Sequence, residues 1–198
     1  MTAFYSRDEK LSQIITLFHR LFSETENVGL SGGYREPFYQ ASVPGIAAKI
    51  QFTRDYLNSC FHEVAHWCIA GKARRQKDDY GYWYWPDGRD GEKQRAFFQA
   101  EAGPQALEWA FATASGETFR MSCDNLSGEV SGEMEFAKAL EMKRSEYLQR
   151  GFPERGEKFL AGLMEMFHPE IAAERYSAWL GQKTLVQEAL ASECEGEV

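Results

Sequence analysis

The chain of 198 residues carries 22 Lys and Arg against 30 Asp and Glu, a formal net charge of −8, and 43% of it is hydrophobic. This hydrophobic fraction excludes a disordered chain and is enough for one globular domain with a sizeable core. The acidic balance argues against nucleic acid or an anionic membrane as a partner, because such binding needs a surplus of Lys and Arg. It suits a protein whose ligand is a cation.

Charge and cysteine patterns predict a cytoplasmic protein. The longest stretch without a charged residue or histidine is the 12 residues Pro37–Ala48, whereas a helix that spans a bilayer takes about 20 apolar residues. The first ten residues carry charges where a signal peptide needs an apolar segment. The four cysteines contain no CxxC pair, so neither a zinc knuckle nor a disulfide scaffold is indicated; they are Cys60, Cys68, Cys123 and Cys194.

The apolar periodicity predicts an α+β fold that is mainly helical, with a few short strands. The first amphipathic helix is expected over Asp8–Phe22, where apolar residues recur at steps of three and four. A turn is expected at Ser31–Gly33. Two short strands are expected to follow, over Glu36–Gln40 and Lys49–Thr53, with a loop between them.

The most regular helix is predicted over Asp55–Lys72. Asp55 can cap the start of this helix, and Gly71 lies at its end. Its apolar face is predicted to consist of Leu57, Phe61, Val64, Ala65, Cys68 and Ile69.

The second half of the chain is predicted to be helical after an aromatic segment. Residues 78–91 are expected to be extended and to end in a turn. Two helical pieces are expected at Glu92–Ala100 and Pro104–Ser115, separated at Gly103–Pro104 because proline lacks a backbone donor. After an irregular segment, further helices are expected near Glu133–Arg150, Glu154–Phe167 and Glu170–Leu180. Residues 1–198 are interpreted as a single catalytic domain, with an acidic tail over about 181–198.

One motif in the chain predicts chemistry. His62-Glu-Val-Ala-His66 is an HExxH sequence on the most regular predicted helix. Four residues advance a helix by about 6 Å and by about one full turn, so both imidazoles project from one face. Neutral imidazole is a good ligand for zinc, iron, copper or nickel. The spacing therefore predicts that His62 and His66 bind one metal ion.

A third ligand is needed, and a carboxylate from a following helix is a common solution. His19 and His168 are poor candidates, since His19 lies in the middle of the first helix and His168 precedes a proline. Glu101 and Glu108 are the two contenders. We favour Glu101, because a bend at the Gly-Pro break could turn its side chain toward the metal, and we interpret Glu108, beside Trp109, as a solvated residue.

Two histidines and one carboxylate leave open positions on the metal, and two chemistries are compatible with them. With zinc, the metal lowers the pKa of a bound water and Glu63 acts as the general base, which gives a metallopeptidase. With Fe(II), the same triad activates dioxygen. The HExxH sequence alone favours the peptidase.

The wider sequence resembles the bacterial elongation factor P hydroxylases, from about residue 8 to about residue 180. The resemblance is carried by HEVAHWCIAGKARR at His62–Arg75, YGYWYWPDGRD at Tyr80–Asp90, PQALEW at Pro104–Trp109 and SCDNL at Ser122–Leu126. It also includes the Glu-Pro-Phe-Tyr39 segment and Pro153-Glu-Arg155. These strings are far more specific than HExxH alone.

The resemblance implies an enzyme that hydroxylates a lysine of elongation factor P already carrying a β-lysyl group. It implies a zincin-like HExxH helix that holds an oxygen-activating metal, Fe(II), with O2 as cosubstrate. Carried over by position, the ligands are His62, His66 and Glu101, the glutamate three residues before Pro104. In such an enzyme Glu63 has no required base role, and we expect it to orient a ligand or a bound water.

Several further groups have two interpretations. Glu63, Asp87, Asp90 and Asp124 could form an acidic lining for the cationic substrate arm, but turn, cap or salt-bridge roles are the simpler interpretation. Tyr82, Trp83, Tyr84 and Trp85 are interpreted as packing residues or as a cation–π wall. Lys72, Arg74 and Arg75 either complement a helix C-terminus or contact elongation factor P. Cys60 and Cys68 are expected to pack in the core.

Overall fold

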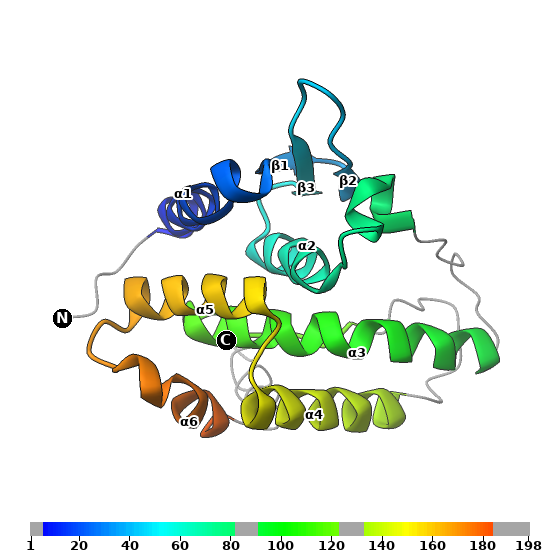
Figure 1. The fold of residues 1–198 in the computed structure, drawn as a ribbon. Coiled ribbons are helices and arrows are strands. Elements are labelled where there is room, and N and C mark those ends of the chain that lie inside the picture. Colours follow the sequence, from blue (N-terminus) through cyan, green and yellow to red (C-terminus); the bar gives the residue numbers. More distant parts are fainter. Residues whose placement is uncertain (1–5, 82–90, 123–132, 184–198) are drawn as a thin grey trace, which may run out of the picture.

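The computed structural model describes residues 6–81, 91–122 and 133–183 (Figure 1). The helices are α1 (Arg7–Glu26), α2 (Leu57–Ile69), α3 (Gly91–Ala114), α4 (Glu133–Arg150), α5 (Glu154–Phe167) and α6 (Tyr176–Gly181), with short 3-10 turns η1 (Arg74–Gln76), η2 (Asp78–Gly81) and η3 (Ala173–Arg175). The strands are β1 (Val28–Tyr34), β2 (Phe38–Gln40) and β3 (Ala48–Thr53). The predicted mainly helical α+β class is confirmed.

The elements are stacked so that α2 lies at the centre. The small sheet covers one side of α2, and α3 with α5 lies on the other side, followed by α4 and α6 (Figure 1). α2 is therefore buried on both faces, and seven of its apolar residues are buried together with His66: Leu57, Cys60, Phe61, Val64, Ala65, Trp67 and Cys68. Polar side chains on a helix that is buried on several sides need hydrogen-bond partners or a specific role, so the two histidines of α2 are candidate functional residues.

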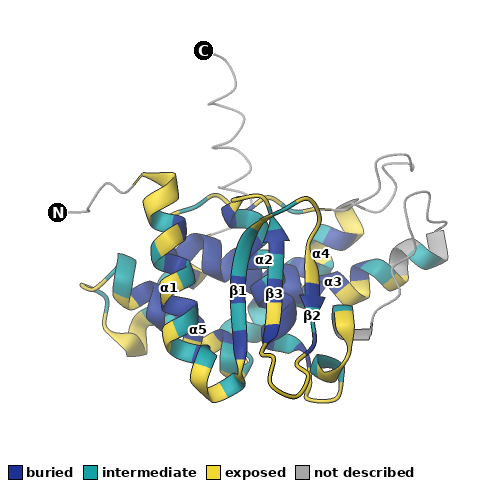
Figure 2. Ribbon diagram, turned by 90° about the horizontal axis from the view of Figure 1, so that it is seen from above, coloured by how far each residue is buried: buried dark blue, intermediate teal, exposed yellow. Residues whose placement is uncertain are grey.

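The sheet has the strand order β1-β3-β2, with β1 parallel and β2 antiparallel to β3 (Figure 2). Ile50 of β3 pairs with Leu30 of β1 and with Tyr39 of β2, and all three side chains are buried. The turn predicted at Ser31–Gly33 is wrong, because these residues continue β1. Glycine at position 32 makes the continuous strand possible, because a Cβ there would lie 2.5 Å from the ring of Phe52 on β3 and would clash with it.

Side chains accept hydrogen bonds from three backbone N–H groups at the two edges of this sheet. On the β1 side, the Leu30 N–H donates to Nε2 of His19 at 2.9 Å. On the β2 side, the N–H groups of Tyr39 and Ala41 donate to Oδ1 of Asp79 at 2.9 Å and Oδ1 of Asp78 at 2.8 Å. Edge strands with free N–H groups would otherwise pair with other chains. His19 thus has a structural partner, in agreement with its exclusion as a ligand.

The helix α2 is shorter than the predicted Asp55–Lys72. Its N-cap is Tyr56, which makes no side-chain cap, so the prediction that Asp55 caps this helix is wrong. The helix ends at Ile69. Its C-terminus is instead held by another element: Nη2 of Arg155, on α5, donates to the carbonyl oxygens of Trp67, Cys68 and Ala70 at 3.0, 3.0 and 2.6 Å. The α5 guanidinium therefore fixes the position of α2.

The helix α3 runs without a break through Pro104, so the prediction of two pieces is wrong. A proline inside a helix costs about 3 kcal/mol, because a backbone bond is lost. Burial offsets this cost here: α3 packs against α2, α4 and α5, and its Leu107 and Phe111 are fully buried. The close packing also uses Gly103, since a Cβ there would lie 3.3 Å from the hydroxyl of Tyr147 on α4.

The C-terminal helices agree with the predictions over α4 and α5. The predicted helix Glu170–Leu180 is instead the 3-10 turn η3 followed by the short helix α6. Most of the predicted acidic tail lies outside the described residues. Among the helices that the structure describes, none is both long and apolar enough to cross a membrane.

Candidate metal centre

The structure brings together the three predicted ligands, His62 and His66 from α2 and Glu101 from α3. One ligand atom from each lies within 4.8 Å of the others. The two Nε2 atoms are 3.1 Å apart. The Glu101 carboxylate lies 3.4 Å from Nε2 of His66 through Oε1 and 3.7 Å from Nε2 of His62 through Oε2.

These separations fit a single ion. Donor atoms about 2.1 Å from one metal lie about 3.0 Å apart at a right angle and about 3.4 Å apart at a tetrahedral angle. The donor set of two imidazoles and one carboxylate also suits a transition metal. The His66 and Glu101 side chains are 6% and 3% exposed, whereas His62 is 27% exposed. Solvent therefore reaches the three residues from the His62 side.

Glu108 is buried beside this site, and the prediction that it is solvated is wrong. Its side chain is 8% exposed, and its Oε2 lies 2.8 Å from Nδ1 of His62. The reason is the unbroken α3: Glu101 and Glu108 are seven residues, or two turns, apart, so they lie on one face of the same helix. The sequence contains this spacing, but the assumed break at Gly103–Pro104 hid it.

Gln105 is a second residue of this face that the sequence analysis did not identify. It lies one turn after Glu101 and contributes to lowering the pKa of the Glu101 carboxylate. Its amide is itself held in place, because Nε2 donates to the Ser122 carbonyl at 2.8 Å and Oε1 accepts from the Ser122 N–H at 3.0 Å. The four-residue spacing from Glu101 is the signal that could have identified it.

The site carries surplus negative charge in the absence of a metal. Burial lowers the pKa of His62, but the hydrogen bond to Glu108 and the charges of Glu108 and Glu101 outweigh it and raise this pKa to about 10. Burial raises the pKa of Glu101, but the charges of His66 and His62 outweigh it and lower this pKa to about 2. A cationic imidazole thus compensates the carboxylates, and a divalent cation would do the same.

The other two acidic residues at the site differ from Glu101. Burial raises the pKa of Glu108, although its contact with His62 opposes this rise. Burial also raises the pKa of Glu63, which is half-buried next to His62 and experiences the charges of both histidines. Glu63 therefore lies within electrostatic reach of the three candidate ligands.

Some of the remaining candidate residues from the sequence lie in the described part of the chain, and others lie outside it. The thiols of Cys60 and Cys68 are buried, which confirms core packing, and burial raises their pKa. Arg75 pairs with Glu26 at 2.6 Å. Tyr82, Trp83, Tyr84, Trp85, Asp87, Asp90 and Asp124 lie outside the described residues. Residues 78–81, predicted to be extended, form the turn η2.

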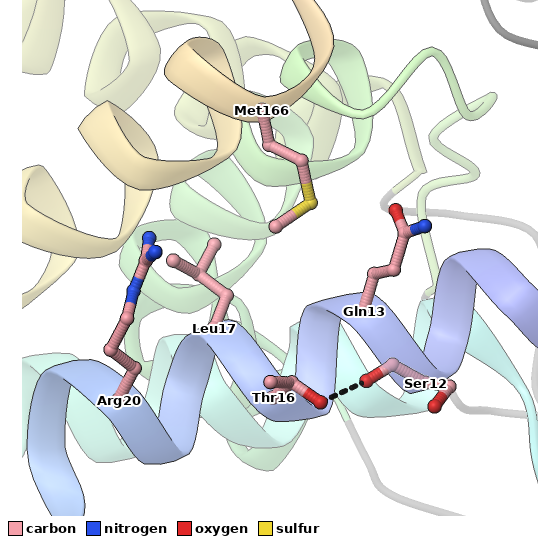
Figure 3. A pocket seen from close by; sticks show the side chains of 6 residues that line it. All are labelled: Ser12, Gln13, Thr16, Leu17, Arg20 and Met166. Carbon is pink, nitrogen blue, oxygen red and sulfur yellow. Dashed lines mark hydrogen bonds between the residues drawn. The ribbon is translucent and has the colours of Figure 1, made fainter.

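A surface hollow between α1 and α5 lies apart from these residues (Figure 3). It is lined by Ser12, Gln13, Thr16, Leu17, Arg20 and Met166. Its lining contains no imidazole, thiol or carboxylate, and one of its hydroxyls, that of Thr16, donates to the Ser12 carbonyl at 2.8 Å. The hollow therefore has no metal ligands and none of the three candidate site residues.

Comparison with known proteins shows the family of this chain. The sequence pattern that defines the family described as "Elongation factor P hydroxylase" matches residues 17–176. A protein of Haemophilus influenzae named elongation factor P lysine hydroxylase is 41% identical over 166 residues, which cover 82% of this chain and 92% of the relative. The matched range contains all of the candidate ligands. The chain therefore belongs to the elongation factor P hydroxylase family, and it is an enzyme of the oxidoreductase class.

Proposed function

We propose that this enzyme hydroxylates the β-lysylated lysine of elongation factor P, with Fe(II) held by His62, His66 and Glu101 and with O2 as cosubstrate. The observation that carries this proposal is the convergence of three ligand atoms within 4.8 Å in a chain of this family. The name of the Haemophilus influenzae relative supports elongation factor P as the substrate.

The donor set supports Fe(II) and an open coordination position. Two neutral imidazoles and one carboxylate occupy one side of an ion, and bound Fe(II) would supply activation of O2 for insertion of one oxygen atom into a C–H bond. The second oxygen atom leaves as water, with two electrons from a reductant. The chain itself holds the ligands rigidly, since His66 and Glu101 are buried, and it leaves access at the more exposed His62.

The charge of the site supports a cationic substrate arm. A β-lysyl-lysine side chain carries protonated amines, and the chain has a net charge of −8. Glu63, half-buried and next to His62 in the sequence, is an acidic residue on which the charges of both histidines act. We propose that it orients a bound water or the substrate arm, with no role as the base of a hydrolysis.

The decisive experiment uses protein purified without oxygen and loaded with Fe(II). After addition of O2, a chemical reductant and β-lysylated elongation factor P, mass spectrometry should show an increment of about 16 Da on the modified peptide. Unmodified elongation factor P serves as the substrate control, and Glu101→Ala as the site control. No increment with the loaded wild-type enzyme would refute the proposal.

The same preparations test the alternative, an HExxH zinc peptidase. That function predicts cleavage of peptides by the zinc-loaded protein and loss of cleavage in Glu63→Ala. We expect no cleavage, and we expect Glu63→Ala to retain the bound metal, since Glu63 is not one of the three converging ligands.

A further inference from the structure

Glu108 makes a specific contact on the far side of the His62 ring. Its Oε2 lies 2.8 Å from Nδ1, while Nε2 on the opposite side of the same ring lies 3.1 Å from Nε2 of His66. The Glu108 side chain is 8% exposed, so water contributes little to its solvation. A buried carboxylate is costly unless it is paired, and the partner of Glu108 is His62.

This contact keeps a hydrogen on Nδ1 of His62. An ionised carboxylate can only accept a hydrogen bond, so the hydrogen in the contact belongs to Nδ1. The metal-free cationic ring carries hydrogen on both nitrogens, and the neutral form that would bind a metal loses the Nε2 hydrogen, keeps the Nδ1 hydrogen and has its lone pair on Nε2. The lone pair then points toward His66 and Glu101, where a metal ion is bound in the proposed function.

We infer that Glu108 is a positioning residue, which fixes the tautomer and ring orientation of His62 and thereby strengthens metal binding. The inference rests on the proposed function, because it needs His62 to be a metal ligand. It adds Glu108 to the proposed site as a residue that contacts a ligand and not the metal itself. Glu101 and Glu108 lie on the same face of α3, so one rigid helix presents both the ligand and the positioning carboxylate to the histidines of α2.

The experiment measures metal binding directly, with Co(II) as the probe. Metal-free wild type is compared with Glu108→Gln, Glu108→Ala, Glu101→Ala and the control Glu165→Gln, which changes an exposed glutamate on α5. Affinity is obtained by competition with a chelator, and the Co(II) absorption bands report the coordination. Melting of the metal-free proteins shows that each variant is folded, and Glu108→Gln keeps the shape of the side chain if Glu108→Ala does not fold.

We expect Glu108→Ala to bind Co(II) roughly 10- to 100-fold more weakly than wild type, which is the usual cost of losing such a partner. Glu108→Gln should lose less, because its amide oxygen still accepts a hydrogen bond from Nδ1. Glu165→Gln should bind as wild type does, and Glu101→Ala should not retain the metal.

A second measurement follows the hydrogen itself. In the Zn(II)-loaded protein, long-range proton–nitrogen NMR should find the His62 hydrogen on Nδ1 and slow to exchange with water in wild type and in Glu108→Gln. It should be fast to exchange in Glu108→Ala. Co(II) affinity of Glu108→Ala within twofold of wild type, or equal losses in both Glu108 variants, would overturn the inference. Loss of binding in Glu101→Ala alone would then leave the proposed metal site intact, whereas retention of metal by Glu101→Ala would refute that site.

Discussion

Two glutamates on one face of α3 have opposite electrostatic environments. Burial raises the pKa of Glu101, but it faces both imidazoles, whose charges lower this pKa to about 2. Glu108 contacts His62 at 2.8 Å and is enclosed, and burial raises its pKa. The charged form is therefore most strongly favoured at the carboxylate that faces the proposed metal position. This difference follows from neighbours, because the two side chains are chemically identical.

The packing behind this face gives a test at single-residue resolution. In Gly156→Ala, the new methyl carbon would lie 2.9 Å from Cδ2 of Leu107, the residue before Glu108. Overpacking of this kind costs about 1–3 kcal/mol, against about 1 kcal/mol that alanine gains over glycine in a helix. We expect a net loss of stability of about 1 kcal/mol, within a range of about 0–2 kcal/mol, measured by urea unfolding.

The matched control is Gly71→Ala. Its new methyl group would have no neighbour within 4 Å, so we expect the free energy of unfolding to change by less than about 0.5 kcal/mol. Equal stabilities of the two variants would contradict the close contact of α5 with α3.

At the scale of single residues, the sequence identified those whose spacing along the chain predicts a shared position on a helix. His62 and His66 were predicted from a four-residue interval on a helix, and Glu101 was preferred from its position before Pro104; the structure brings these three side chains together. Their role as ligands stays a prediction. Glu108 was a contender for the third ligand but was interpreted as solvated, because the assumed break at Gly103–Pro104 separated it from the helix face of Glu101.

At the scale of elements, α2 depends on an arginine from another helix. Arg155 donates to three carbonyl oxygens at the C-terminus of α2, and its guanidinium lies 4.8 Å from the centre of the Trp67 ring. A hydrogen bond to a charged group contributes about 1.5–3 kcal/mol in protein mutants, and the contributions here do not add because the three contacts share the two hydrogens of one nitrogen. We expect Arg155→Ala to lower the free energy of unfolding by about 2–4 kcal/mol in a urea titration.

Two further variants test whether the shape or only the charge of the Arg155 side chain stabilises the protein. Arg155→Lys keeps the charge but loses the planar group, so it should recover only part of the stability. Arg150→Ala, at the exposed end of α4, should be nearly neutral, since its side chain is 79% exposed. Full recovery by lysine would show that charge at the helix end is sufficient.

The elements also show where local sequence rules fail. The α4 and α5 bounds follow from their own periodicity and agree with prediction. In contrast, α3 continues through Pro104 and β1 continues through Gly32, although both residues usually interrupt such elements. In both cases tertiary packing decides: α3 lies against three helices, and Gly32 lies against Phe52. Contacts of this kind connect residues that are distant in sequence, so local patterns do not contain them.

For the whole molecule, the candidate ligands join two helices, α2 and α3. A metal that binds the folded chain and not the unfolded chain stabilises it by about 2.7 kcal/mol at a free concentration 100 times its Kd. For a chain of this length, that energy raises the melting temperature by roughly 5–11 °C. We expect this rise on addition of Fe(II) under anaerobic conditions, measured by calorimetry.

Removal of the metal should reverse the effect. A chelator is expected to return the melting temperature to that of the metal-free protein, and Glu101→Ala should show no rise at the same metal concentration. A similar rise in Glu101→Ala would mean that the stabilising ion binds elsewhere in the chain.

The closed edges of the sheet have a consequence for how a macromolecule can approach. The outward N–H groups of Leu30, Tyr39 and Ala41 are already occupied by His19, Asp79 and Asp78. An unfolded peptide that binds by adding a strand would have to displace these side chains first. Recognition of an intact, folded protein that extends one long side chain toward His62 requires no such displacement. These three positions therefore disfavour a partner that binds as an added strand.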